Sequence, residues 1–209
     1  ETEPLTLETI AQAEGPSVMV DRAVPMAIGA SAVVNDHRAG MEAAVEHLID
    51  LGHRRIALIT GSSAQLPGRE RMEAMRAVVA RRDEPVEAIY RPGSFSAEHG
   101  EAAARDVLSA DEPPTAIIAG GNQLLIGVLR VLRERNLRIT RDVSLVTCDD
   151  VPLSELYEPP IATIDRDTVG LGRVAAELLV RVGDPSAHRE TPWLICRRPG
   201  GVRLSVHRS

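Results

Sequence analysis

The side chains in this sequence that could bind or transform a ligand stand at the ends of short apolar runs. They are carboxylates, amides and guanidinium groups, which hydrogen-bond hydroxyl and amide groups well. They fall at residues 21, 35–36, 62–71, 91–95, 120–123, 149–150 and 165–167. In an open α/β sheet, ligands bind at the carboxyl ends of the strands. The pattern therefore favours a site for a polyol or a heterocycle over a purely apolar pocket.

The sequence lacks the motifs that many enzymes use. Residues 61–69 follow an apolar run, but they lack the Lys-Ser/Thr ending with which a phosphate loop reaches the terminal phosphates. There is no G-x-S-x-G nucleophile turn, no H-E-x-x-H zinc motif and no pair of cysteine ligands. The adjacent carboxylates Asp149 and Asp150 are more typical of a turn or a ligand contact. We therefore predict a binding protein without catalysis, metal or cofactor.

Composition and charge indicate a globular protein with an aliphatic core. Of 209 residues, 44% are hydrophobic but only 2% are aromatic, so Ala, Val, Leu and Ile must fill the core. The net charge of −6 argues against a surface that grips DNA directly, because that task needs a basic face. No apolar run has transmembrane length, and the N-terminus does not resemble a signal segment. One disulfide between Cys148 and Cys196 is an alternative, but both are expected to be reduced, which suits a cytoplasmic protein with no membrane partner.

Short apolar runs alternate with amphipathic helical patterns and must position these polar residues. Strands are expected at residues 17–21, 32–34, 55–60, 87–90, 115–119, 143–147, 161–164 and 193–196. Helices are expected at residues 37–51, 68–82, 96–109, 122–136 and 168–182, with a short one near 5–13. Alternating strands and helices require crossover connections, and so a mostly parallel sheet. The first expected strand, at residue 17, comes late for a doubly wound sheet. The chain is therefore expected to begin in the middle of the fold.

Seven segments, in order along nearly the whole chain, resemble the lactose-repressor (LacI/GalR) family of bacterial transcription regulators. They are residues 45–57, 71–75, 114–127, 142–150, 159–164, 171–176 and 197–198. The first contains the Gly-His-Arg-Arg-Ile-Ala sequence at residues 52–57, and the fourth ends in the paired aspartates. Ala74 departs from the family pattern, which usually has glycine at that position.

The resemblance implies an α/β fold of two doubly wound parallel-sheet subdomains of the periplasmic-binding-protein-like type. Residues 1–35, joined by residues 165–190, would form a remnant of the first subdomain. Residues 36–163, joined by residues 191–209, would form the second. The first subdomain would be incomplete, and the family's N-terminal helix-turn-helix domain would be absent from this chain.

The function implied is that of the ligand-sensing and dimerisation core of a bacterial DNA-binding transcriptional repressor. A small-molecule effector, expected to be a sugar or related metabolite, would bind between the subdomains and shift a two-state equilibrium. Operator DNA would be bound through the missing domain. The helix at residues 122–136 and the stretch 153–157 match the family's homodimer surface, although the apolar residues of that helix could equally be core. The alternative is a periplasmic sugar-binding protein of a transporter, and an enzyme on a doubly wound sheet is a weaker rival.

The resemblance assigns effector contacts to six residues: Asp21, Arg71, Phe95, Asn122, Asp149 and Arg166. The carboxylate of Asp149 is expected to accept hydrogen bonds from ligand hydroxyls or ring nitrogens, and Arg71 is expected to clamp the effector. Phe95 would stack on a sugar or purine face. Gly121 stands where many members have Asn, so Asn122 could replace that contact.

A purely structural alternative exists for Asp21, Phe95 and Arg71. Asp21 could be a surface carboxylate in a turn. Phe95 could pack in the core or against a loop. Arg71 could form an ion pair on a helix surface with Glu70 or Glu73, which flank it.

Arg166 stands where the family often has Gln. An arginine in a ligand site hints at an acidic or phosphorylated ligand, because a guanidinium group recognises such anions well. The alternative is that Arg166 pairs with its neighbours Asp165 or Asp167.

Overall fold

The computed structural model describes residues 8–10, 12, 15–21, 31–149, 154, 156–183, 196–199 and 202–203. The chain divides into two compact units. The first comprises Glu1–Asp36 and Asp167–Pro199, and the second comprises His37–Arg166 and Gly200–Ser209. Within the described residues, no helix combines the length and the apolar character that crossing a membrane requires.

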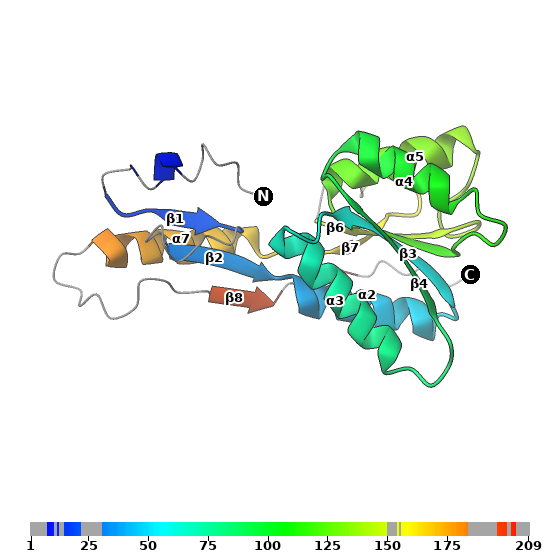
Figure 1. The fold of residues 1–209 in the computed structure, drawn as a ribbon, viewed down its shortest axis with the longest axis horizontal. Helices are drawn as coiled ribbons and strands as arrows, with labels where there is room; N and C mark the ends of the chain where they lie inside the picture. Colours follow the sequence, from blue (N-terminus) through cyan, green and yellow to red (C-terminus); the bar gives the residue numbers. More distant parts are fainter. Residues whose placement is uncertain are drawn as a thin grey trace. The chain divides into compact units, whose positions relative to one another are not determined.

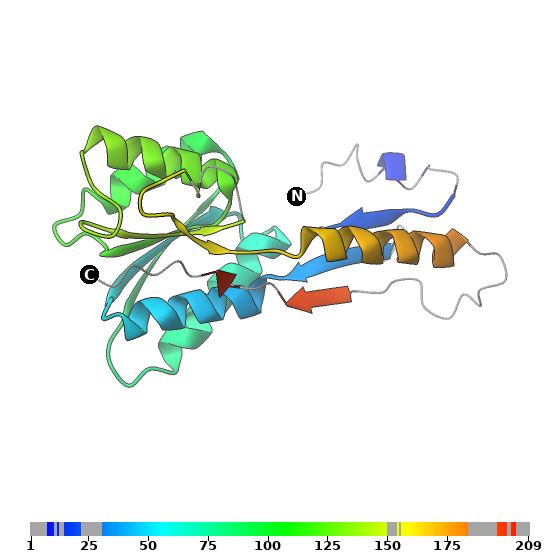
Figure 2. The same ribbon diagram turned by 180° about the vertical axis from the view of Figure 1, so that it is seen from behind.

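Among the described residues, the first unit contains a small parallel sheet on which helix α7 packs. Its elements are β1 (Val18–Val20), β2 (Ser31–Asp36), β8 (Cys196–Pro199) and α7 (Thr168–Gly183). The strand order is β1-β2-β8, and both pairings are parallel. Helix α7 runs along β1 and β2 in Figure 2, and its Leu171 and Leu178 pack on Val33 of β2. These two leucines stand two helical turns apart and so lie on the same face of α7.

The second unit contains a larger sheet whose strand order is β4-β3-β5-β6-β7-β9. Its strands are β3 (Arg55–Gly61), β4 (Glu87–Gly93), β5 (Ala116–Ala119), β6 (Ser144–Cys148), β7 (Ala162–Ile164) and β9 (Val202–Arg203). All pairings are parallel except that of β9, which runs antiparallel to β7. The central strands are buried on both faces, which explains why the sequence shows them as continuous apolar runs.

In the described part of the chain, helices cover the two faces of this sheet (Figure 1). They are α2 (His37–Asp50), α3 (Leu66–Ala80), α4 (Ala97–Val107) and α5 (Asn122–Glu134). Ile56 and Leu58 of β3 belong to the core cluster beneath α2 and α3, whereas Ala57 and Ile59 belong to the cluster beneath α4 and α5. Alternate residues of one strand thus supply two cores, as the period of a β-strand requires.

The sequence leaves open whether the apolar residues of α5 belong to the core or to a dimer surface. Leu124, Leu125, Val128 and Val131 are each 0% exposed, so these residues belong to the core. They are not available to a dimer surface, and the structural alternative is correct for them.

Helices α4 and α5 lie close together because glycines meet where they cross. A Cβ atom at Gly127 would lie 2.2 Å from the carbonyl oxygen of Ala97, and one at Gly100 would lie 2.4 Å from that of Leu124. Both contacts are with backbone, which does not move aside easily. The positions therefore require glycine.

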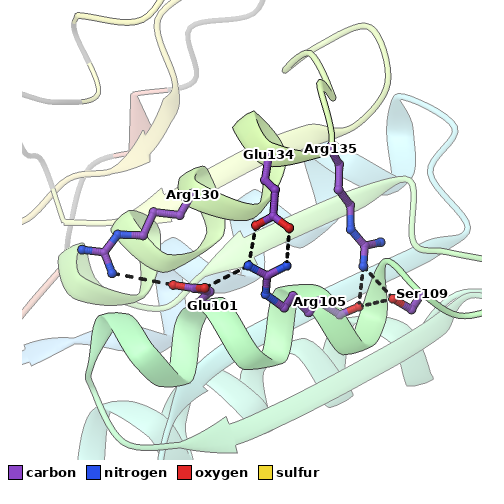
Figure 3. Close-up of polar contacts among 6 residues, drawn as sticks. All are labelled: Glu101, Arg105, Ser109, Arg130, Glu134 and Arg135. Carbon is purple, nitrogen blue, oxygen red and sulfur yellow. Dashed lines mark hydrogen bonds and ion pairs between the residues drawn. The ribbon is translucent and has the colours of Figure 1, made fainter.

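Charged side chains also bridge α4 and α5 (Figure 3). Arg105 donates to both carboxylate oxygens of Glu134 and, at 3.0 Å, to Oε1 of Glu101. Nη1 of Arg130 lies 3.7 Å from Oε2 of Glu101. Ion pairs that face solvent contribute about 0–1 kcal/mol each, so the glycine contact decides how closely the two helices pack.

The predicted α/β architecture with mostly parallel sheets is confirmed. One part of the predicted division differs from the structure. The sequence predicts that residues 191–209 return to the second subdomain, but β8 pairs with β2 in the first unit and only β9 joins the larger sheet. The boundary falls after Pro199, where the sequence has a Pro-Gly pair typical of a turn. The helix expected near residues 5–13 and the start of the strand expected at 193–196 fall largely outside the described residues.

Candidate functional site

Five of the six predicted site residues belong to the second unit. Four of them follow a strand or begin a helix at one edge of the sheet, and Arg71 lies in the second turn of α3. Strands β4, β3, β5, β6 and β7 are parallel, so their carboxyl ends meet at the same edge. The chain passes from β3 to β4 on one side and then to β5 on the other, which makes the β3–β5 boundary a topological switch point. Ligands bind at such points in open α/β sheets.

Arg71 extends from α3 over the ends of β5 and β6. Its side chain is buried, with 4% of the residue exposed, and Nη1 donates to the carbonyl oxygen of Gly120 at 2.6 Å. Its Nη2 lies 4.0 Å from Oδ1 of Asp149. Glu73, which was a possible surface partner of Arg71, instead accepts from Arg38 at 3.3 Å. Arg71 is therefore an interior residue of the carboxyl edge and not a helix-surface residue.

Asp149 directly follows β6 and is held by two neighbouring elements. Its backbone N–H donates to the carbonyl oxygen of Ile164 in β7 at 3.1 Å. Its Oδ1 lies 2.7 Å from Nε of Arg166. Its φ of 90° is rare for a residue other than glycine, and backbone strain of this kind concentrates at ligand-binding sites. Asp149 and Arg166 both remain partly exposed, at 18% and 28% of their side chains.

Phe95 follows β4 and packs on backbone between two strand ends. A Cβ atom at Gly61 would lie 2.0 Å from the ring, and one at Gly121 would lie 3.3 Å from it. The ring contacts the core beneath α4 and α5 but is only partly buried. Its centroid lies 6.0 Å from Cζ of Arg71, at the outer limit of a cation–π contact. Phe95 thus packs on one side and leaves part of its ring accessible at the edge.

Asn122 and Asp21 complete the set of predicted residues. Asn122 is the exposed first residue of α5, and its Oδ1 accepts from the backbone N–H of Gln123 at 2.7 Å. Asp21 lies in the first unit, at the end of β1, with a φ of 56°. Its Oδ1 accepts from the N–H of Asn35 at 3.3 Å. The structure therefore brings Arg71, Asp149 and Arg166 together. The hydrogen bond of Asp21, in contrast, is made within the first unit.

The sequence analysis missed the glycines and the threonine that shape this edge. The carbonyl of Gly120 anchors Arg71, and Gly61 provides the seat of the Phe95 ring. Thr60, at the end of β3, is fully buried next to Gly120. Glycines at the ends of adjacent strands indicate close approach of other groups, and that signal was present in the sequence.

The thiol of Cys148, which precedes Asp149, is buried. Burial raises the pKa of this thiol, and the guanidinium groups of Arg71 and Arg166 only oppose that effect. The neutral thiol is a poor nucleophile. The described residues at this edge include guanidinium donors, the carboxylate of Asp149 and an aromatic ring, a set suited to holding a polar molecule by hydrogen bonds.

Comparison with known proteins agrees with the fold described above and with the family that the sequence resembles. The family of the periplasmic binding protein-like domain matches residues 45–198. The ribose operon repressor of Escherichia coli (strain K12) is 31% identical over 188 residues, which are 87% of this chain and 57% of that protein. The chain thus spans just over half the length of that relative.

Two solved structures extend the comparison. A protein described as a LacI transcriptional regulator, from Bacillus cereus subsp. cytotoxis NVH 391-98, has a TM-score of 0.80 and 27% identity, over 99% of this chain and 73% of that one. A LacI family transcriptional regulator from Enterococcus faecium, with bound ribose, has a TM-score of 0.76 and 26% identity, over 90% of this chain and 68% of that one. The chain therefore belongs to the periplasmic binding protein-like family, in the form found in LacI-type regulators.

Proposed function

We propose that this chain is the ligand-sensing and dimerisation core of a cytoplasmic bacterial repressor that responds to a sugar or related metabolite. The observation that carries the proposal is the meeting of Arg71, Asp149 and Arg166 at the carboxyl edge of the larger sheet. The relatives support it, since they are named as a ribose operon repressor and LacI-type regulators. A transporter receptor is not favoured, because none of these named relatives is one.

Effector recognition would be made by hydrogen bonds at this edge, with no covalent step. The carboxylate of Asp149 would accept from ligand hydroxyls, the guanidinium N–H groups of Arg166 would donate, and the accessible part of Phe95 would contact an apolar face of the ligand. Arg71 is nearly inaccessible, so its role would be to hold Asp149 and the Gly120 turn in place. Asn122 would present an exposed amide at the start of α5.

Regulation would follow from a difference in effector affinity between two conformations of the core. A ligand shifts such an equilibrium only by its differential affinity for the two states. Coupling of about 1–3 kcal/mol changes operator affinity by roughly 5–150-fold. The operator would be bound by a separate DNA-binding domain of the homodimer, which agrees with the acidic charge of this core.

Direct binding measurements test the site. Isothermal titration calorimetry of this chain against pentoses, hexoses, their phosphates and their sugar acids should find a ligand. Asp149→Asn should weaken its binding at least about tenfold, because a charge-assisted acceptor is lost. Asp111→Asn is the matched control, since Asp111 is exposed on a loop remote from this edge. If Asp149→Asn binds the same compound as tightly as the wild type does, the site assignment is wrong.

A further inference from the structure

The chain crosses between its two units at three places, after Asp36, Arg166 and Pro199. On the side of the second unit, α2 follows the first crossing, β7 precedes the second and β9 follows the third. These three elements contact one another within the second unit. A residue that holds them together therefore holds one end of each crossing.

Ile164, the last residue of β7, lies where these elements meet. It pairs in register with Cys148 of β6 on one side and with Val202 of β9 on the other. Only 8% of Ile164 is exposed, and it belongs to the core cluster beneath α2 and α3. One residue thus links the strand before the second crossing to the strand after the third.

The first turn of α2 packs directly on the side chain of Ile164. A Cβ atom at Gly40 would lie 2.5 Å from Cγ2 of Ile164, so this methyl group occupies the space that a side chain at residue 40 would fill. Isoleucine is branched at Cβ and has a restricted χ1 angle, so the methyl group does not turn aside easily in a packed core. The contact therefore sets how closely the start of α2 approaches the end of β7.

The backbone of Ile164 also holds part of the candidate site. Its carbonyl oxygen accepts from the N–H of Asp149 at 3.1 Å. Because Asp149 has a φ of 90°, this hydrogen bond helps to hold an unusual backbone conformation. A movement of the end of β7 would therefore reach Asp149 through this bond, and a movement of Asp149 would reach β7.

Close packing makes such a residue suited to transmitting a conformational change. Packed side chains have a few discrete arrangements and do not deform continuously, so a small shift at one contact is passed on to the next. Ile164 has a hydrogen bond to the site, a side-chain contact to α2 and a pairing with β9. Its contacts thus extend from Asp149 to the elements at all three crossings.

We propose that Ile164 is a positioning residue that couples Asp149 to the three crossings, and that its contact with Gly40 sets this coupling. The inference rests on the proposed function, in which an effector bound at Asp149 changes DNA binding. It adds the residue through which the site acts on the connections between the units.

The first test uses this chain without ligand and two variants that disturb the contact in opposite ways. Gly40→Ala adds a methyl group that overlaps Cγ2, whereas Ile164→Leu removes Cγ2 at nearly constant volume. In each variant, NMR should show the amide hydrogen of Asp149 exchanging at least about tenfold faster, because its bond to Ile164 opens more often. The combined variant should return to within about threefold of the wild-type rate, since the alanine methyl group takes the place of Cγ2. Unchanged exchange in both single variants, or no recovery in the combined variant, would overturn the coupling.

Ile56→Leu is the matched control for this test. Ile56 is buried in the same core cluster, but it lies near the start of β3, at the opposite edge of the sheet. The same substitution there should leave the exchange rate at Asp149 within about threefold of the wild type. If Ile56→Leu accelerates exchange as much as Ile164→Leu does, the effect is a general loosening of the core and the proposal is wrong.

The second test measures the operator affinity of full-length protein with no ligand added, using a labelled operator selected from random DNA. Gly40→Ala and Ile164→Leu should each change this affinity by about 2–30-fold, the range seen for residues that couple distant sites, and the combined variant should restore it. Ile56→Leu should leave it unchanged.

The outcomes of the second test separate the two proposals. If the wild type binds its operator and the folded variants bind it equally well, Ile164 has no coupling role while the proposed function stands. A wild type that selects no DNA contradicts both. Circular dichroism establishes that each variant is folded, and if Gly40→Ala is not, the result for Ile164→Leu decides.

Discussion

Arg71 illustrates, at the scale of single residues, what the sequence can and cannot show. Its place in a segment resembling LacI-type regulators indicated a functional residue, and the structure places it at the carboxyl edge. Its hydrogen-bond partner, Gly120, is 49 residues away in the chain. No local pattern connects two such positions. The contact arises only when α3 and the end of β5 are brought together by the sheet.

Arg166 and Asp149 show the same limit. The sequence offered Asp165 and Asp167 as partners of Arg166 because they are its neighbours. The structure pairs Arg166 with Asp149, which is distant in sequence, across the ends of β6 and β7. Parallel strands that lie side by side bring together residues at their ends that are distant in sequence.

The packing of the Phe95 ring on Gly61 gives a prediction about a single residue. Gly61→Ala should lower the free energy of unfolding by about 1–3 kcal/mol, because the new methyl group would overlap the ring and force it away. Equilibrium urea unfolding measures the loss. The same substitution in a Phe95→Ala background should cost much less, since the overlapping ring is gone. An equal cost in both backgrounds would contradict the packing described here.

At the scale of elements, burial decided which parts of the fold could be predicted. Strand β3 is buried on both faces and appears in the sequence as the continuous apolar run Ile56 to Ile59. Helix α5 could be predicted from its apolar stripe. The sheet that β8 joins could not, because its Cys-Arg-Arg-Pro sequence has no alternation that would identify a buried face. Strand pairing over long sequence separations depends on the whole fold.

The end of α4 provides a prediction about an element. Arg135 donates to the carbonyl oxygens of Leu108 at 2.7 Å and Arg105 at 3.3 Å, and to Oγ of Ser109 at 2.6 Å. It thereby satisfies carbonyl groups that the helix itself leaves without partners. Arg135→Ala should lower the free energy of unfolding by about 1–2 kcal/mol, as measured by urea titration.

The matched control for this prediction lies two residues earlier. Arg133 is exposed, and the described part of the chain shows no hydrogen bond or ion pair for its side chain. Arg133→Ala should change the free energy of unfolding by no more than about 0.5 kcal/mol. Equal effects of the two substitutions would mean that the loss of an arginine side chain, and not the contacts at the end of α4, determines the change.

At the scale of the whole molecule, dimerisation is the first property to test. Leu156 lies in the stretch that resembles the family's dimer surface, and 80% of it is exposed. We expect Leu156→Arg to convert a dimer to a monomer in size-exclusion chromatography with light scattering, without loss of fold, because the side chain makes little contact within its own chain. Leu51→Arg, at an apolar residue 52% exposed beyond the end of α2, should remain dimeric. A dimer that survives Leu156→Arg would place the interface elsewhere.

In the proposed function, the three crossings of the chain between its units would relate the site to regulation. They fall after Asp36, Arg166 and Pro199. Arg166 is thus the last residue before a crossing, and its guanidinium group is paired with Asp149. A ligand that competes for Asp149 would act directly on the residue beside that crossing. This is the kind of differential contact that a two-state switch requires.

The central claim is that an effector bound at Asp149 controls DNA binding, and operator affinity tests it most directly. Fluorescence anisotropy would follow a labelled operator, selected from random DNA, with full-length protein that contains this core. Addition of the tightest ligand found by calorimetry should change operator affinity by roughly 5–150-fold in the wild type. In Asp149→Asn the affinity without ligand should be unchanged and the response lost. A full response in Asp149→Asn would contradict the account.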